Sequence, residues 1–176
     1  ATDNYGEYED WIEIYNYGNT TIDIGGLYIT DDLTDLLLWQ IPDNQPDSTS
    51  ILPGEFLVLW ADKDTEQGVL HINLKLSTNG EEIAIVEHTL TNDYIIDSKV
   101  FGLQVVDVSY GRFPDGSTNW ESFNTTTFGL SNISNLGPPP TIISGIYINE
   151  FLTINDSNIV DNYGEHEDWI EFYNAS

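Results

Sequence analysis

The two ends of the chain carry almost the same sequence. Residues 3–16 align with residues 161–174 at a constant offset of 158, and they differ only at Tyr8/His166 and Ile14/Phe172. A match of this length, which includes a Trp and two Tyr, indicates an internal repeat of domain size. One repeat is long enough to bury a hydrophobic core. We therefore interpret the chain as one domain followed by the start of a second copy.

Short runs rich in β-branched and aromatic residues recur roughly every ten residues along the first copy. Turn-forming pairs such as Gly25-Gly26, Pro53-Gly54 and Asn79-Gly80 separate them. This spacing is typical of a β-sandwich or barrel, and no segment shows the 3.6-residue period of a helix. The predicted strands are Trp11–Tyr15, Thr21–Ile24, Leu27–Thr30, Leu36–Ile41, Phe56–Trp60, His71–Leu76, Ile83–Val86, Ile95–Phe101 and Val108–Phe113.

The composition changes after residue 132. Residues 133–144 include three consecutive prolines, Pro138-Pro139-Pro140, which favour an extended, semi-rigid spacer. The predicted organisation is a sandwich domain at 1–132, a spacer at 133–144 and the start of a second copy at 145–176.

An ordered series of segments over about residues 10–132 resembles the lamin tail domain family, the immunoglobulin-like module of nuclear lamins and many prokaryotic surface proteins. The segments are Asp10–Asn16, Asp23–Asp32, Leu52–Glu55, Leu59–Asp62, His71–Ser77, Gly80-Glu81, Asp97–Gly102 and Asp107–Gly116. The resemblance implies an all-β, immunoglobulin-like β-sandwich of the lamin-tail-domain type.

The chain departs from the family pattern in one respect. Family members usually open with a strand that reads like Ile-Asn-Glu-Phe, and here those residues occur at 148–151, beyond the spacer. We therefore expect the opening strand to be displaced to the C-terminal tail. A sandwich that lacks a strand exposes an unpaired edge, which is a template for another strand.

Three arrangements can supply the missing strand: the tail folds back on its own body, it inserts into a neighbouring molecule, or the chain is part of a tandem array. Burial of two side chains of the strand contributes about 3–6 kcal/mol, whereas association costs about 4–15 kcal/mol. We expect head-to-tail continuity in preference to fold-back, because the prolines stiffen the spacer. The predicted donor residues are Ile146, Ile148, Phe151, Trp169, Ile170 and Phe172.

The net charge of −26 excludes several partners. An acidic surface repels phosphate backbones and anionic membranes, so we expect neither nucleic-acid binding nor direct membrane insertion. The chain has no Cys and no Met, which fits an extracellular or cell-surface location. No nucleophile elbow and no Gly-rich phosphate loop is present, so we expect no enzyme and no certain cofactor.

Acidic clusters offer a possible calcium site. Asp62, Asp64 and Glu66 alternate in one segment, and Asp31 and Asp32 lie in a predicted turn. Ca²⁺ takes six to eight oxygen ligands, often from loops, although a solvated acidic face explains the same clusters. The three histidines, His71, His88 and His166, lie far apart in sequence and show no metal-ligand spacing.

Five Asn-X-Ser/Thr sequons are glycosylation candidates in a secretory setting, although a chain rich in Asn, Ser and Thr also forms sequons by accident. They begin at Asn19, Asn124, Asn132, Asn155 and Asn174.

Two functions from different classes fit these features. The first is a structural subunit or tandem repeat of an extracellular fibre or cell-surface assembly, whose partner is another copy of itself, joined head-to-tail by C-terminal strand donation. The second is a carbohydrate- or protein-binding accessory module of a larger secreted or surface-anchored enzyme, which rests on analogy with the family.

Overall fold

The computed structural model describes residues 3–132, 146–152 and 170–171, and nearly all of its regular structure is strand. The long strands contain the apolar runs predicted from the sequence, and the helices are single turns. In chain order the elements are β1 (Asp10–Asn16), β2 (Ile22–Asp23), β3 (Tyr28–Thr30), β4 (Trp39–Gln40), α1 (Pro46–Thr49), β5 (Ser50–Ile51), β6 (Phe56–Ala61), the 3₁₀ turn η1 (Thr65–Gln67), β7 (Glu82–His88), β8 (Asp93–Val100), β9 (Ser109–Arg112), β10 (Trp120–Phe123), β11 (Ile146–Leu152) and β12 (Ile170–Glu171).

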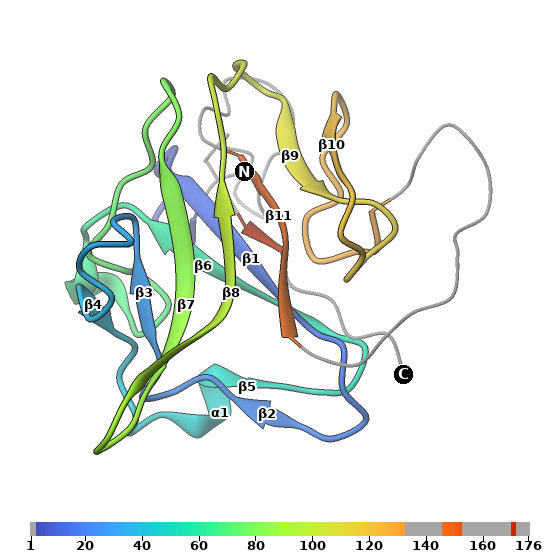
Figure 1. The fold of residues 1–176 in the computed structure, drawn as a ribbon. Coiled ribbons are helices and arrows are strands. Elements are labelled where there is room, and N and C mark those ends of the chain that lie inside the picture. The colour runs from blue at the N-terminus through green and yellow to red at the C-terminus, as the bar shows by residue number, and fades with distance from the viewer. Residues whose placement is uncertain (1–2, 133–145, 153–169, 172–176) are drawn as a thin grey trace.

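Two four-stranded sheets form the body of the molecule (Figure 1). One has the order β4-β3-β7-β8 and the other the order β12-β11-β1-β6, and β9-β10 and β2-β5 form two smaller antiparallel pairs. Every ladder between the named strands is antiparallel. This architecture confirms the predicted all-β, immunoglobulin-like sandwich.

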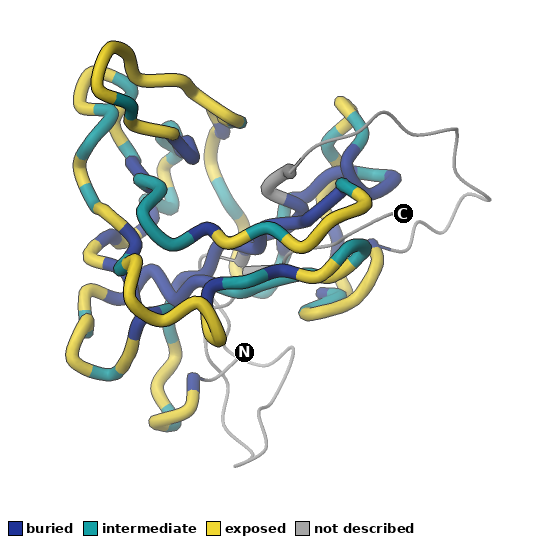
Figure 2. Tube along the Cα trace, turned by 90° about the horizontal axis from the view of Figure 1, so that it is seen from below, coloured by how far each residue is buried: buried dark blue, intermediate teal, exposed yellow. Residues whose placement is uncertain are grey.

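Strand β1 lies at the centre of the core, and all seven of its residues are buried. Ile12 and Ile14 belong to the main hydrophobic cluster. The opposite face is covered by the segment that follows β10: the ring of Phe128 packs edge-on against Trp11 at 6.0 Å, and Gly129 N–H donates to Glu13. Figure 2 shows the buried segments running through the middle of the molecule, with exposed loops around them. Both faces of β1, which is the first copy of the repeated segment, therefore pack against other parts of the domain.

The predicted strand at 71–76 is wrong. The alternation of buried and exposed residues is real, because Ile72, Leu74 and Leu76 are buried. After a single bridge from His71 to Trp60, however, the segment has no ladder partner among the described residues. The backbone of Leu76 instead donates to the side chain of Asp10 at 3.0 Å. A side chain thus satisfies a backbone group that a neighbouring strand would otherwise pair.

Four short elements escaped prediction: β5, η1, β10 and α1. Strand β10 spans four residues between Ser/Thr/Asn-rich stretches that indicate loop. Helix α1 is one turn that starts at Pro46, which suits the first helical position because proline has no N–H to pair.

Strand β11 completes the sheet beside β1. Its backbone pairs with β1 along most of its length, with Ile12 opposite Phe151 and Ile14 opposite Ile148, and a bulge lies between these pairs. The opening strand is therefore supplied from beyond the spacer, as the displaced Ile-Asn-Glu-Phe motif predicts. In this single chain it comes from the same molecule, which is the fold-back arrangement that we ranked below head-to-tail continuity with a neighbour or in a tandem array.

Candidate functional site

The site that distinguishes this chain is the slot that holds β11. Strand β1 forms one wall of the slot, and β9 with β10 lies close to β11 on the other side (Figure 1). Phe151 is fully buried there. Its ring lies 4.8 Å from that of Phe101 and within 6.4 Å of those of Tyr110 and Trp120. An aromatic side chain in such a pocket is a strong anchor for a strand.

Backbone contact between β9 and β11 requires a glycine. A Cβ atom at Gly111 would lie 2.3 Å from the carbonyl oxygen of Asn149 and 2.9 Å from the Cα of Glu150. No side chain fits at that separation, so β9 approaches the centre of β11 only because residue 111 is glycine.

A buried polar network fixes the register of β11. The Nδ2 of Asn149 donates to Glu13 Oε1 at 3.0 Å. The Nδ2 of Asn132 donates to the carbonyl oxygens of Asn149, at 3.2 Å, and of Arg112, at 3.0 Å. A one-residue slip would remove Asn149 from these partners and turn the side chains to the opposite face. The slot therefore selects the Asn-Glu pair of β11 as well as its apolar residues.

Two carboxyl groups in this network have raised pKa values. The pKa of Glu150 is raised to about 8, mainly by burial and to a smaller extent by the charge of Asp115. Hydrogen bonds from Thr127 lower the pKa and offset part of this rise. Burial also raises the pKa of Asp115 to about 6, partly offset by hydrogen bonds from Ser131 and Asn132. Because each carboxyl is more easily buried when neutral, the docked strand favours the protonated forms.

Strand β11 also pairs on its other edge. Phe151 is opposite Ile170 and Glu150 is opposite Glu171 in β12. At the repeat offset of 158, Ile170 and Glu171 are the counterparts of Ile12 and Glu13 in β1. Ile12 and Ile170 are equivalent residues of the two repeats. Phe151 lies opposite both of them, Ile12 on one edge of β11 and Ile170 on the other.

The predicted donor residues fall into four groups. Phe151 is the core anchor; Ile146 and Ile148 pair with β1 through the backbone, and Ile170 belongs to β12. Trp169 and Phe172 lie outside the described residues. Sequence analysis missed the close-approach glycine Gly111 and the polar partners Glu13, Asp115, Asn149 and Glu150, and it treated Asn132 only as a sequon. Their types carry no signal of burial, although the family motif does contain the Asn-Glu pair.

The predicted acidic clusters separate in the structure. Asp32 caps its own turn by accepting from the backbone and hydroxyl of Thr34, and these bonds lower its pKa. Desolvation raises the pKa of Asp64, and the charges of Asp62 and Glu66 raise it further. Among the described residues, one group of acidic and histidine side chains brings three ligand atoms together: Asp3, Asp62 and His71. The predicted calcium ligands Asp31, Asp32, Asp64 and Glu66 are not in that group.

Three of the five sequons lie in the described part of the chain. Asn19 and Asn124 are exposed. Asn132 is buried and its Nδ2, the atom that would carry a glycan, donates to two backbone carbonyls in the slot. A glycan at Asn132 is thus incompatible with this arrangement of β11. Asn155 and Asn174 lie outside the described residues.

Comparison with known families decides the identity of the module. A family model for the lamin tail domain matches residues 1–101. The chain belongs to the lamin tail domain family. The match covers β1 to β8, and the structure extends the lamin-tail sandwich through β9, β10 and β11. No curated protein and no solved structure matches the chain significantly.

The lamin tail domain is an immunoglobulin-like structural module. Among the described residues of this one, no helix is both long and apolar enough to cross a membrane.

Proposed function

We propose that this lamin tail domain is a structural subunit or tandem repeat of an extracellular, cell-surface assembly, in which copies are joined by β11. The observation that carries the proposal is the double pairing of β11, whose Phe151 lies opposite Ile12 and also opposite the equivalent Ile170. A strand that fits both copies of one repeat segment can close the sheet of either copy. No catalytic role is part of the proposal.

The energetics of exchange support this function. Insertion into a neighbour makes the same contacts as fold-back, so the two states differ mainly in the entropy of association, as in domain swapping. The same-chain strand has an effective concentration on the order of 1 mM when a short linker carries it. Dilute chains therefore close on themselves, and exchange becomes favourable when neighbouring copies are held at comparable local concentration. Head-to-tail exchange is heterologous and continues into a filament unless it closes a ring.

The composition supports a surface location. The chain has neither Cys nor Met, and its net charge is −26. A chain with these properties resists thiol and thioether oxidation and stays soluble through charge repulsion.

A cysteine pair at one register position tests the proposal. Ile14 and Ile148 are opposite each other in the β1–β11 ladder, a separation that suits a disulfide, and the chain has no native Cys. In the Ile14→Cys/Ile148→Cys variant we expect an intramolecular disulfide at micromolar concentration. Above about 1 mM we expect a ladder of dimers, trimers and larger species on a non-reducing gel.

Two controls make the result decisive. Each single cysteine variant can form a dimer but no ladder, and a chain that lacks residues 145–176 should remain monomeric in light scattering. If the double variant stays monomeric at every concentration, or if the truncated chain still assembles, head-to-tail strand exchange is wrong. The accessory-module function then becomes the better explanation of the family membership.

A further inference from the structure

Three ligand-type side chains from separate parts of the sequence converge at the end of β6. Asp62 directly follows β6, His71 lies beside Trp60 of β6 through a backbone bridge, and Asp3 lies in the segment before β1. One ligand atom from each of the three lies within 4.8 Å of the other two. The oxygen of Asp62 and the Nδ1 of His71 are 2.5 Å apart.

The two carboxylates are oriented by the backbone. Asp3 Oδ1 accepts from the N–H groups of Tyr5 and Glu7, both at 2.9 Å, and Asp62 Oδ1 accepts from the N–H of Asp64 at 2.9 Å. Each carboxylate thus uses one oxygen for support. The second oxygen of Asp62 faces His71 Nδ1, and the second oxygen of Asp3 points to no hydrogen-bond donor among the described residues. Support of this kind holds ligands in place at metal sites.

An unsatisfied oxygen marks the site. Asp3 is 1% exposed, and its Oδ2 is buried without a hydrogen-bond partner among the described residues. Gln67 also has a buried oxygen, Oε1, without such a partner. Both atoms are acceptors, and a buried acceptor that lacks a partner is costly. A bound cation satisfies such an acceptor, as a donor such as water also does.

If both carboxylates are ionised, a divalent cation balances the charges of the cluster. Two buried carboxylates carry a charge of −2, and a protonated His71 would neutralise only one of them. The surroundings screen little, because Trp60 stacks on His71 at a centroid distance of 6.4 Å and Tyr5 meets its edge at 6.0 Å. A divalent ion with a neutral imidazole and two carboxylates gives a neutral site.

A cavity of about 220 Å³ adjoins the cluster and supplies space for further ligands. His71 lines it together with Asn4, Trp60, Gln67 and Gly68. The volume is more than a water molecule needs, so water can complete the coordination of an ion that has three protein ligands.

We propose that Asp3, Asp62 and His71 form a binding site for a divalent transition-metal ion of the Zn²⁺ type. Imidazole and carboxylate are common Zn²⁺ ligands, and three protein ligands plus water is a familiar Zn²⁺ arrangement. Ca²⁺ requires six to eight oxygen ligands. A site that contains an imidazole therefore suits Ca²⁺ less well than Zn²⁺. The bound ion joins the segment before β1 to the loop after β6. This site is independent of strand exchange.

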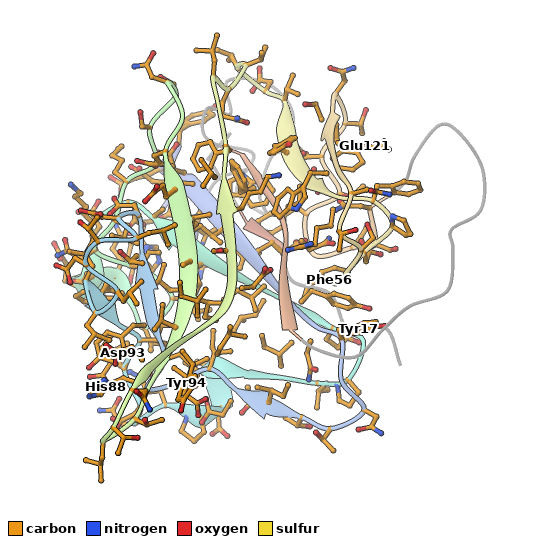
Figure 3. All side chains as sticks on the ribbon, in the orientation of Figure 1. Tyr17, Phe56, His88, Asp93, Tyr94 and Glu121 are labelled. Atoms are coloured by element: carbon orange, nitrogen blue, oxygen red, sulfur yellow. The ribbon has the colours of Figure 1, made fainter. Side chains whose placement is uncertain are left out.

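A second histidine–aspartate pair shows what the buried site adds. His88 Nδ1 and Asp93 Oδ1 are 2.6 Å apart at the end of the β7–β8 hairpin (Figure 3). Their side chains are 46% and 36% exposed, and among the described residues they join no three-ligand group. Two exposed side chains compete poorly with water for a metal ion. This pair therefore serves as an internal control for Zn²⁺ binding.

Titration of the metal-stripped full chain with Zn²⁺ tests the proposal. Calorimetry should give one strong site per chain, and Co²⁺ should produce the visible absorption of a low-coordinate site. Asp3→Asn should weaken Zn²⁺ binding at least tenfold. It leaves the core strands untouched, so its fold can be verified by circular dichroism. His71→Asn tests the nitrogen ligand and should also weaken binding at least tenfold.

The controls are Asp64→Asn, which removes one charge from the same loop, and His88→Asn, which removes the exposed pair. Both should leave the Zn²⁺ affinity within about twofold. The proposal is overturned if Asp64→Asn weakens binding as much as Asp3→Asn does, since a diffuse acidic surface then explains the affinity. It is also overturned if folded Asp3→Asn binds like the native chain, or if the site takes Ca²⁺ and not Zn²⁺.

Discussion

The two four-stranded sheets of this lamin tail domain are assembled in different ways. The sheet β4-β3-β7-β8 draws all its strands from residues 28–100 of the body, and its longest ladder joins the consecutive strands β7 and β8. The sheet β12-β11-β1-β6 takes β11 from beyond the spacer. Closure of the longer loop costs more entropy, and the chain compensates with the anchor Phe151 and a buried polar network. The comparison shows that β11, which comes from far along the chain, is held by a buried anchor and by specific polar contacts.

The largest expected effect comes from the anchor of the distant strand. Phe151→Ala should lower the free energy of unfolding by about 3–5 kcal/mol, because it removes a fully buried aromatic ring and leaves a cavity. Ile95→Ala in β8 of the other sheet is an exposed reference, and it should cost less than about 1 kcal/mol because Ile95 is 46% exposed. Urea unfolding of both variants measures the difference. Equal losses would show that Phe151 is not a buried anchor of β11.

The next effect depends on pH. Glu150 has a pKa of about 8 in the fold against 4.5 as its ordinary value, so the folded state binds a proton that the unfolded state has released. The contribution of this proton to the free energy of unfolding is complete below pH 4.5, declines as the pH rises and is lost above about pH 8. The slope approaches 1.4 kcal/mol per pH unit. Asp115, with a pKa of about 6, adds a similar decline at lower pH.

Between pH 6 and pH 8 the free energy of unfolding of the native chain should fall by about 2–3 kcal/mol. Glu150→Gln should remove most of that fall. Glu121→Gln, on β10 (Figure 3), removes one exposed carboxylate and should leave that slope unchanged. Denaturant unfolding at pH 6, 7 and 8 gives the three slopes. A Glu150→Gln slope that matches the native one would contradict the assignment.

A smaller effect is expected from the backbone contact. Gly111→Ala places a methyl group 2.3 Å from the carbonyl oxygen of Asn149, so β9 and β11 must move apart at a cost of about 1–3 kcal/mol. Gly102→Ala is the matched control, because no atom of the described residues lies within 4 Å of its Cβ position. Limited proteolysis should release β11 faster in Gly111→Ala and at the native rate in Gly102→Ala. Equal rates would show that the close approach does not hold the strand.

The smallest effect is expected at the end of the β7–β8 hairpin. Asp93→Asn breaks the exposed pair with His88 and should change the free energy of unfolding by at most about 0.5 kcal/mol. Thermal unfolding at low and high salt tests this. A loss above 1 kcal/mol would mean that the locally built sheet also depends on specific polar contacts.

Sequence patterns predicted the fold class because local chemistry controls it. Apolar runs of strand length, bounded by Gly, Pro and Asn, correctly placed most long strands, and Gly80 has the positive φ of +94° that its predicted turn needs. The prediction for 71–76 failed because alternation reports burial, which is right there, and not the presence of a neighbouring strand. Strand β10 was not predicted because four residues are too few to establish the two-residue period of a strand.

The sequence by itself determined that this is a lamin-tail sandwich whose opening strand lies beyond a proline spacer, because periodicity, turn residues and the repeat are all local or directly readable. Only the tertiary structure decided that Glu150 is buried beside Thr127, that Gly111 touches β11, and that Asp3 reaches Asp62 and His71. These contacts join residues far apart in the chain, and their burial depends on the packing of whole strands. No local pattern encodes that packing.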